Sequence, residues 1–249
     1  MKAHLHTIPV TEAFESGDEC PFCYLERQAE QSAIRYAAGP AASYMEPEIR
    51  AETDKTGFCR IHIQKLFDYG NALGAALMIQ SHLITLRENL REEIEGFEAP
   101  GKRGLFNKKR PAEGGLPERI LAQVDRCFIC ERMDATMDRY FQTFFAMIKD
   151  GEFRSQVESS KGFCLRHFGE LLESAEMYLP GGQREWFYRA VFPLMEENLQ
   201  RVQEDLDWLV CKYDYRNLNA DWKNSKDALQ RAMQKIEGIY PADKPHKNE

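Results

Sequence analysis

Six cysteines and two histidines form a pattern that occurs twice in the chain. Each copy consists of a Cys-x-x-Cys pair followed by the sequence Gly-Phe-Cys-x-x-His. The cysteine of the second motif lies 39 residues after the first cysteine of the pair in one copy and 37 residues after it in the other. The residues are Cys20, Cys23, Cys59 and His62 in the first copy, and Cys127, Cys130, Cys164 and His167 in the second. Three thiolates and one neutral imidazole are a common tetrahedral ligand set for zinc. The pattern therefore predicts two metal sites, and its recurrence indicates that one unit was duplicated.

The spacing within each motif brings its own ligands together. A Cys-x-x-Cys turn lets two thiolates converge on one ion, and Pro21 in the first copy suits such a turn. In Gly-Phe-Cys-x-x-His the glycine lets the chain bend into a helix, in which residues i and i+3 share a face. About 35 intervening residues suffice to fold a helix back, so we expect each site to be built within its own copy. The alternative is a crossed arrangement, in which the first Cys-x-x-Cys pair shares an ion with Cys164 and His167.

Two Zn²⁺ ions are the favoured cofactors for these ligands. A shell of four protein ligands leaves no position for water, so each ion would be structural and would clamp the starts of two helices together. An iron–sulfur cluster is the first alternative, because thiolate-rich sites with one histidine also hold iron and a phenylalanine neighbours each ligand pair. Metal-free thiols, including a redox pair, are the second. The spacing of the ligands does not separate these possibilities.

The identity of the metal bears on the function. Structural zinc favours a binding or adaptor module whose surface engages another protein. A cluster or an exchangeable metal favours a redox or sensor protein. An enzyme has little support, because the chain shows no Ser/His/Asp order, paired-carboxylate signature or dinucleotide fingerprint. The sequence therefore assigns no catalytic residue.

Apolar residues at steps of three and four predict the helices that must carry these ligands. The clearest run consists of Met133, Met137, Tyr140, Phe141, Phe144, Phe145 and Ile148. Further helical patterns follow His62, follow His167 and cover about 183–210 and 219–237. No alternating strand pattern with a hairpin turn is present. We therefore expect an all-α fold, a helical bundle of two pseudo-equivalent repeats that each hold one metal site.

A stretch rich in glycine, proline and charge separates the two repeats. The expected organisation is a first helical repeat at 1–96, a linker or loop at 97–118, a second repeat with C-terminal helices at 119–237 and a polar tail at 238–249. The linker contains a basic cluster made of Lys102, Arg103, Lys108, Lys109 and Arg110, although the chain carries a formal charge of −7. This cluster is either a solvated connector or a contact element for an acidic protein partner, nucleic acid or a membrane surface.

The apolar segments are too short or too polar for a membrane span or a signal peptide. The N-terminus lacks an apolar core, and the most apolar window, 72–86, is interrupted by polar residues and is shorter than the ~20 residues that a bilayer requires. We therefore expect a cytoplasmic protein without a transmembrane segment, in which the cysteines stay reduced.

The motifs also carry a family resemblance. The paired Cys-x-x-Cys and Gly-Phe-Cys-x-x-His units, the basic Gly-Leu-Phe linker and the later Lys212-Tyr213-Asp214-Tyr215-Arg216 resemble a bacterial family of unknown function. The resemblance covers most of the chain. It implies a bacterial cytoplasmic protein and brings no known activity or catalytic residue to transfer.

Overall fold

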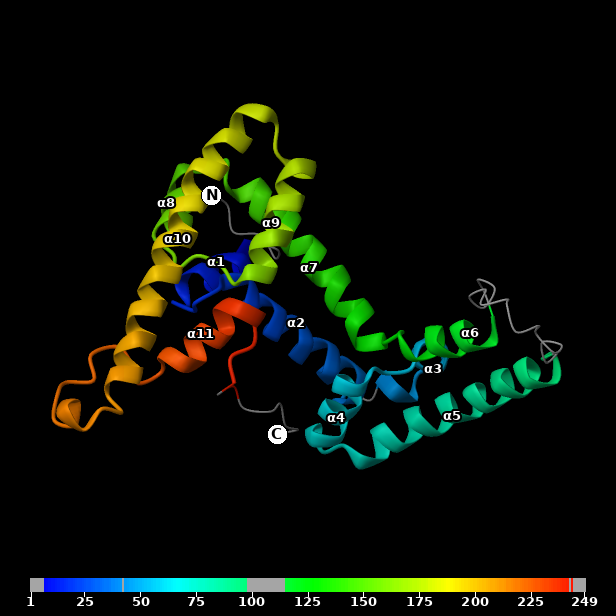
Figure 1. Ribbon diagram of the computed structural model, residues 1–249. Coiled ribbons are helices and arrows are strands. Elements are labelled where there is room, and N and C mark those ends of the chain that lie inside the picture. Colours follow the sequence, from blue (N-terminus) through cyan, green and yellow to red (C-terminus); the bar gives the residue numbers. More distant parts are fainter. Residues whose placement is uncertain (1–6, 42, 98–114, 242, 244–249) are drawn as a thin grey trace, which may run out of the picture. The chain divides into compact units, whose positions relative to one another are not determined.

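The computed structural model describes residues 7–41, 43–97, 115–241 and 243. Within these ranges the chain is helical and has no β-strand, which confirms the predicted all-α class (Figure 1). The α-helices are α1 (Thr7–Glu15), α2 (Pro21–Ala38), α3 (Pro47–Thr56), α4 (Arg60–Tyr69), α5 (Ala72–Glu95), α6 (Leu116–Val124), α7 (Phe128–Met147), α8 (Gly151–Glu158), α9 (Leu165–Tyr178), α10 (Gly181–Cys211) and α11 (Ala228–Glu237). Two 3₁₀ helices, η1 (Ser43–Met45) and η2 (Tyr215–Asn217), lie in the connections. None of the described helices is long and apolar enough to cross a membrane.

The chain forms two compact units that do not follow the order of the sequence. Unit 1 consists of Met1–Ala29 and Ala135–Lys244, and unit 2 is built mainly from Glu30–Asp134. Helices α2 and α7 each pass from one unit into the other, because the unit boundaries fall inside them. The boundaries of these units fall at other residues than those of the expected repeats at 1–96 and 119–237, and the division into repeats stays a prediction. The first Cys-x-x-Cys pair belongs to unit 1, and the second belongs to unit 2.

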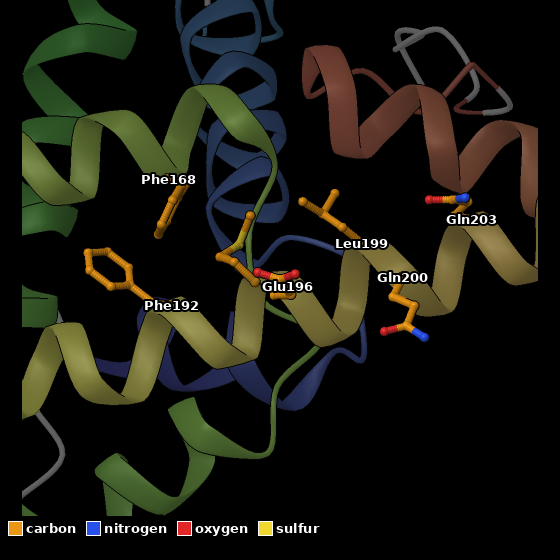
Figure 2. A pocket seen from close by; sticks show the side chains of 7 residues that line it. Phe168, Phe192, Glu196, Leu199, Gln200 and Gln203 are labelled. Atoms are coloured by element: carbon orange, nitrogen blue, oxygen red, sulfur yellow. The ribbon is translucent and has the colours of Figure 1, made fainter.

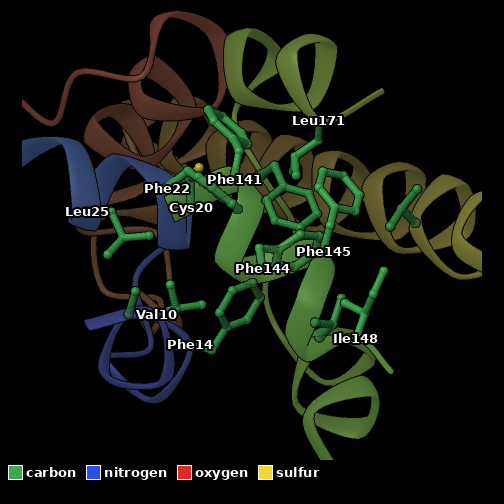
Figure 3. Packing of buried hydrophobic residues seen from close by; sticks show 14 of the residues in the cluster. Val10, Phe14, Cys20, Phe22, Leu25, Phe141, Phe144, Phe145, Ile148 and Leu171 are labelled. Atoms are coloured by element: carbon green, nitrogen blue, oxygen red, sulfur yellow. The ribbon is translucent and has the colours of Figure 1, made fainter. Parts of the chain in front are cut away.

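An aromatic core fills unit 1 (Figure 3). Most of the apolar stripe predicted along α7 is buried, and Phe144 has no exposed surface. The ring of Phe144 stacks on Phe14 at 5.8 Å between centroids and meets Phe22 edge-on at 5.5 Å. Phe22 lies between the two cysteines of the first pair and also stacks on Phe141 at 4.5 Å. Phe22 thus anchors the first Cys-x-x-Cys turn in the core of unit 1.

Unit 2 has a smaller core. Its largest buried apolar side chains include Ile34, Phe58, Leu66, Met78 and Phe128. Helix α5 has 24 residues but buries only Gly74 and Met78, and α6 buries none of its residues. The apolar side chains of α5 and α6 therefore remain largely at the surface of unit 2.

The segment after α10 differs from the prediction made from its sequence. Helix α10 covers the predicted helix at 183–210, but α11 begins at Ala228 rather than near residue 219. The buried Lys212 donates hydrogen bonds from Nζ to the carbonyl oxygens of Asn217 and Ala220, both at 2.6 Å. These bonds satisfy main-chain acceptors that a helix would have used, so the segment forms turns. Cys211 has no partner at metal-ligand spacing, and its sequence context predicts a buried small apolar side chain, but the structure leaves it exposed.

Candidate metal centres

The two Cys/His groups of the structure are crossed between the sequence copies. Site A contains Cys20, Cys23, Cys164 and His167, and site B contains Cys59, His62, Cys127 and Cys130. Site A lies wholly in unit 1, and site B lies wholly in unit 2. The prediction that each copy builds its own site is therefore wrong. The eight predicted residues nevertheless form two groups that could each hold a metal ion.

Packing rather than loop length explains this pairing. The free-energy cost of closing a loop rises only slowly with its length, so neighbouring motifs had little advantage over distant ones. The ring of Phe22 lies 4.5 Å from that of Phe141 and 6.1 Å from that of Phe163, which places the first Cys-x-x-Cys pair beside the second Gly-Phe-Cys-x-x-His motif. In unit 2 the Phe128 N–H donates to the Gly57 carbonyl oxygen at 2.9 Å and joins the other two motifs.

Both Gly-Phe-Cys-x-x-His motifs adopt the same backbone conformation. Gly57 and Gly162 have φ angles of 62° and 73°, in the left-handed region that glycine occupies without strain. The next-but-one residue is the N-cap of a helix, with φ and ψ of −70° and 166° at Cys59 and −76° and 161° at Cys164. The N–H of His167 lies 3.4 Å from Cys164 Sγ. Unpaired N–H groups and the helix dipole stabilise a thiolate at such a position.

In site A one imidazole nitrogen lies close to three sulfurs. The distances from His167 Nδ1 to the Sγ atoms of Cys20, Cys23 and Cys164 are 3.5, 3.4 and 3.2 Å, and the last two sulfurs lie 3.6 Å apart. All four residues are buried. A tetrahedral zinc ion, with bonds of about 2.3 Å to sulfur and about 2.0 Å to nitrogen, sets S···S edges of about 3.8 Å and S···N edges of about 3.5 Å. The donors of site A are therefore spaced as they would be around one tetrahedral ion.

Site B has the same donor spacing in a different environment. His62 Nδ1 lies 3.3 Å from the Sγ atoms of Cys59, Cys127 and Cys130, and the first and last of these sulfurs lie 3.9 Å apart. Cys59 and Cys130 are half-buried, whereas the other two residues are buried. The Nε2 atom of His62 lies 3.1 Å from Glu30 Oε1. A histidine that ligates a metal commonly bonds its second ring nitrogen to a carboxylate, which fixes the orientation of the ring.

The neighbours of Glu30 hold it as a carboxylate. Lys65 Nζ donates to Glu30 Oε2 at 2.5 Å. Burial raises the pKa of Glu30, but the hydrogen bonds from His62 and Lys65 outweigh burial and lower that pKa to about 2. Burial lowers the pKa of His62, but its bonds to Cys127 and Glu30 outweigh burial and raise that pKa to about 10. The cysteines of site B and the Glu30 carboxylate thus favour a positive charge at His62. A metal cation bound between the four ligands would experience the same attraction.

The carboxylates of site A lie farther from its histidine. Glu26 and Glu170 place an oxygen 3.8 and 3.9 Å from His167 Nε2, beyond the length of a direct hydrogen bond. Burial lowers the pKa of His167, but its contacts with Cys164 and Cys20 raise that pKa to about 10. The field at His167 therefore comes mainly from the thiol groups.

The cysteines of both sites are thiols rather than disulfides. All seven cysteines are free, and the sulfurs of Cys23 and Cys164 and those of Cys59 and Cys130 lie 3.6 and 3.9 Å apart, well beyond the disulfide bond length of about 2.05 Å. The four donor atoms of each site all lie within 4.8 Å of one another. Each site can therefore hold one metal ion with four protein ligands.

Some residues around the sites have no signal in the sequence, and one predicted element falls outside the described residues. Glu30 lies 32 residues before its partner His62, and no motif marks it. Lys65 lies three residues after His62, so helical spacing alone could have suggested that the two are neighbours. The basic cluster at 102–110 lies outside the described residues, and its role as a contact element stays a prediction.

A depression of about 560 Å³ lies between α9 and α10 and shares no residue with either metal site (Figure 2). Its lining consists of Phe168, Phe192, Met195, Glu196, Leu199, Gln200 and Gln203. A single carboxylate among apolar side chains and amides supplies no acid–base pair or nucleophile. The depression therefore offers no support for an enzyme.

Comparisons with known proteins agree with the resemblance seen in the sequence. Residues 1–243 match DUF6062, a family of unknown function. The chain belongs to this family. A relative from Caldicellulosiruptor sp. (strain Rt8B.4), described as an uncharacterized 23.9 kDa protein in the xynA 3' region, is 21% identical over 206 residues, which cover 82% of this chain and 87% of the relative. No solved structure matches the chain. Membership of DUF6062 brings no activity with it, so the function has to be argued from the two Cys/His sites.

Proposed function

We propose that sites A and B each bind one structural Zn²⁺ ion, in a helical module that binds another protein. The observation that supports the metal most directly is the spacing of the donors. Nitrogen-to-sulfur distances of 3.2–3.5 Å and sulfur-to-sulfur distances of 3.6 and 3.9 Å match the edges of a tetrahedron around one zinc ion. Zinc suits this ligand set because it accepts both thiolate and imidazole ligands in tetrahedral sites.

A structural role follows from the number of ligands. Three thiolates and one imidazole complete a tetrahedral shell, so no position remains for a catalytic water. Site A joins the start of α2 to the start of α9, and site B joins the start of α4 to the start of α7. Because a structural site does not exist in the unfolded chain, its binding free energy contributes to folding. The two ions would therefore hold together helices that are far apart in the sequence.

The iron–sulfur alternative is less well supported by the geometry. The ligands of a cluster bind different iron atoms and must lie farther apart than the edges of one tetrahedron, whereas these donors lie within 4.8 Å of one another. A single iron ion would fit the same four donors. The test therefore has to identify the element as well as count the ions.

Metal analysis of the purified full chain, together with its absorption spectrum, makes this test. The proposal expects two equivalents of zinc per chain and no visible absorption. Iron with a visible thiolate band would overturn the choice of metal, and a chain that folds without any metal would overturn the structural role.

The exposed face of α5 supports the binding role. Residues 72–86 of this helix contain no aspartate, glutamate, lysine or arginine. Leu73, Ile79 and Leu83 are 65%, 38% and 62% exposed. A long apolar helix face is unfavourable in water unless a second surface covers it. We assign that second surface to another protein, with the apolar face of α5 packed into an apolar groove.

Two substitutions on α5 test this assignment. Leu83→Gln should lower the amount of a specific crosslinked partner because it removes an apolar contact, while the zinc content stays at two equivalents. Glu88→Gln is the matched control, since it changes a charge on the same helix beyond the apolar stretch. Equal partner capture by Leu83→Gln and the unmodified chain would place the binding surface elsewhere.

A further inference from the structure

The two sites differ in how completely the protein covers their sulfurs. In site A the exposed fractions of Cys20, Cys23 and Cys164 are 0%, 1% and 0%. In site B the side chains of Cys59 and Cys130 are only half-buried. A chelator can therefore approach a sulfur of site B from solvent, whereas access to site A requires part of unit 1 to move.

The C-terminal end of helix α11 covers part of site A. The helix packs against α9 and α10, and its C-cap is Gly238, which has a φ of 80°. A Cβ atom added at Gly238 would lie 3.4 Å from Cys164 Sγ and 3.5 Å from Cys23 Sγ. The main chain at the end of α11 therefore lies directly against two of the four ligands.

Polar rather than apolar contacts hold α11 in place. Arg231, Gln234 and Lys235 are buried, with exposed fractions of 7%, 2% and 1%. The large apolar residues of the same helix face solvent, as Leu229, Met233 and Ile236 are 47%, 43% and 57% exposed, and Ala228 is its one buried small apolar residue. The usual orientation of an amphipathic helix is thus reversed, so the position of α11 depends on specific hydrogen bonds.

Those hydrogen bonds are directed at the chain segment that enters site A. Gln234 Nε2 donates to Asp18 Oδ1 at 2.6 Å, and Lys235 Nζ donates to the Glu19 carbonyl oxygen at 2.6 Å. The same ammonium group also donates to the carbonyl oxygen of Lys161. Glu19 immediately precedes Cys20, and Lys161 lies three residues before Cys164. Lys235 therefore ties together the two segments that bring the ligands into site A.

A comparison of the two sites shows why site A needs such a tie. In site B the two ligand segments are joined by the hydrogen bond from the Phe128 N–H to the Gly57 carbonyl oxygen. Phe128 directly follows the first cysteine of its pair, and the residue in the same place in site A is Pro21. Proline has no N–H, so site A cannot form this bond. Lys235, from a helix far along the chain, supplies a link between the segments instead.

We propose that site A holds its metal ion as a kinetically inert centre locked by α11 through Lys235, whereas site B exchanges its ion with chelators in solution. This inference rests on the proposed function, because it takes both sites to be loaded with zinc. The two ions would then have different roles. The ion of site A is a permanent part of the fold of unit 1, whereas the ion of site B can leave or be replaced at the surface of unit 2.

Metal release from the full chain to the chromophoric chelator pyridylazoresorcinol tests this division. The total zinc is measured first, since fewer than two equivalents would contradict the proposed function rather than this inference. Release should then occur in two phases of equal amplitude, with rates that differ by about tenfold or more. Cys59→Ser should leave only the slow phase, and Cys164→Ser should leave only the fast phase. A single phase, or a fast phase that survives in Cys59→Ser, would overturn the proposal.

Lys235→Met tests the role of the lock, because it keeps the length of the side chain and removes the ammonium group. It should accelerate the slow phase by about tenfold or more and leave the fast phase unchanged, as expected for a residue that supports the ligands of one site. Lys65→Met is the matched control, since it removes an ammonium group that contacts Glu30 of site B. It should leave the slow phase of site A unchanged. An unchanged slow phase in Lys235→Met would remove Lys235 from the mechanism. The two-phase release and its assignment need no Lys235 variant, so the inertness of site A stays testable even if Lys235→Met does not fold.

Discussion

The contact between Glu30 and His62 allows a direct measurement of how much a carboxylate bonded to a ligating histidine strengthens metal binding. Glu30 Oε1 lies 3.1 Å from His62 Nε2, and the carboxylate also accepts a hydrogen bond from Lys65. Glu30→Gln keeps the shape of the side chain and removes its charge. Loss of such a supporting carboxylate typically weakens metal binding by about 10- to 100-fold, which corresponds to about 1.4–2.7 kcal/mol. We expect a loss of this size for site B.

The assay is a competition titration of zinc between the protein and a chelator of known affinity. A Cys164→Ser background removes site A, so that the measured Kd belongs to site B. The matched control is Glu26→Gln in a Cys59→Ser background, which reports on site A. Glu26 places its nearest oxygen 3.8 Å from His167 Nε2, too far for a direct hydrogen bond, so its replacement should change the Kd less than about threefold.

Either of two results would refute this reasoning. An unchanged Kd in Glu30→Gln would mean that packing alone orients His62. Equal losses in Glu30→Gln and Glu26→Gln would mean that general negative charge, and not the hydrogen bond, supports the histidines.

Three further predictions concern the core, a glycine and the linker. Phe144→Ala should lower the free energy of unfolding by about 3–5 kcal/mol, measured in urea by the fluorescence of the three tryptophans, which all lie in unit 1. Met177→Ala, at a side chain of the same unit that is 73% exposed, should change that free energy by less than about 0.5 kcal/mol. Similar losses in both variants would contradict the assigned core. Gly57→Ala should lower the melting temperature, because φ is 62° and the new Cβ would lie 2.4 Å from His82 Nε2. The expected loss in the free energy of unfolding is on the order of 1–3 kcal/mol. An unchanged melting temperature would show that this strain is absent. Replacement of the five basic residues in 102–110 by glutamine should weaken partner capture in a salt-dependent way without loss of zinc, whereas unchanged capture at low salt would identify a solvated connector.

The sequence was sufficient to predict the helices and the ligand types because both depend on local spacing. The stripe along α7 recurs every three to four residues, and the structure buries most of it in the aromatic core of unit 1. The Gly-Phe-Cys-x-x-His motif predicted a bend and a helix start, and both copies show them at Gly57 and Gly162. The start of α11 was missed because Lys212 binds main-chain carbonyls that lie 5 and 8 residues away, a contact with no periodic signal.

The pairing of the ligands could not be predicted because it depends on contacts between distant segments. Either pairing gives two sets of three cysteines and one histidine, and loop-closure entropy hardly separates them. The choice rests on contacts such as the stacking of Phe22 on Phe141, which only a three-dimensional structure displays. The contact of Lys235 with Glu19 was still harder to predict, because the two residues lie 216 positions apart in the sequence. The sequence alone would place this lysine at the surface, as most lysines are.

The zinc content of two double variants tests the central claim, that two ions are held by crossed ligand sets. Cys23→Ser with Cys164→Ser removes two ligands of site A and should leave one equivalent of zinc. Cys23→Ser with Cys59→Ser removes one ligand from each site and should leave none, while Cys211→Ser should retain both equivalents. If the first pair abolishes all zinc and the second leaves one equivalent, each sequence copy builds its own site and the crossed arrangement is wrong.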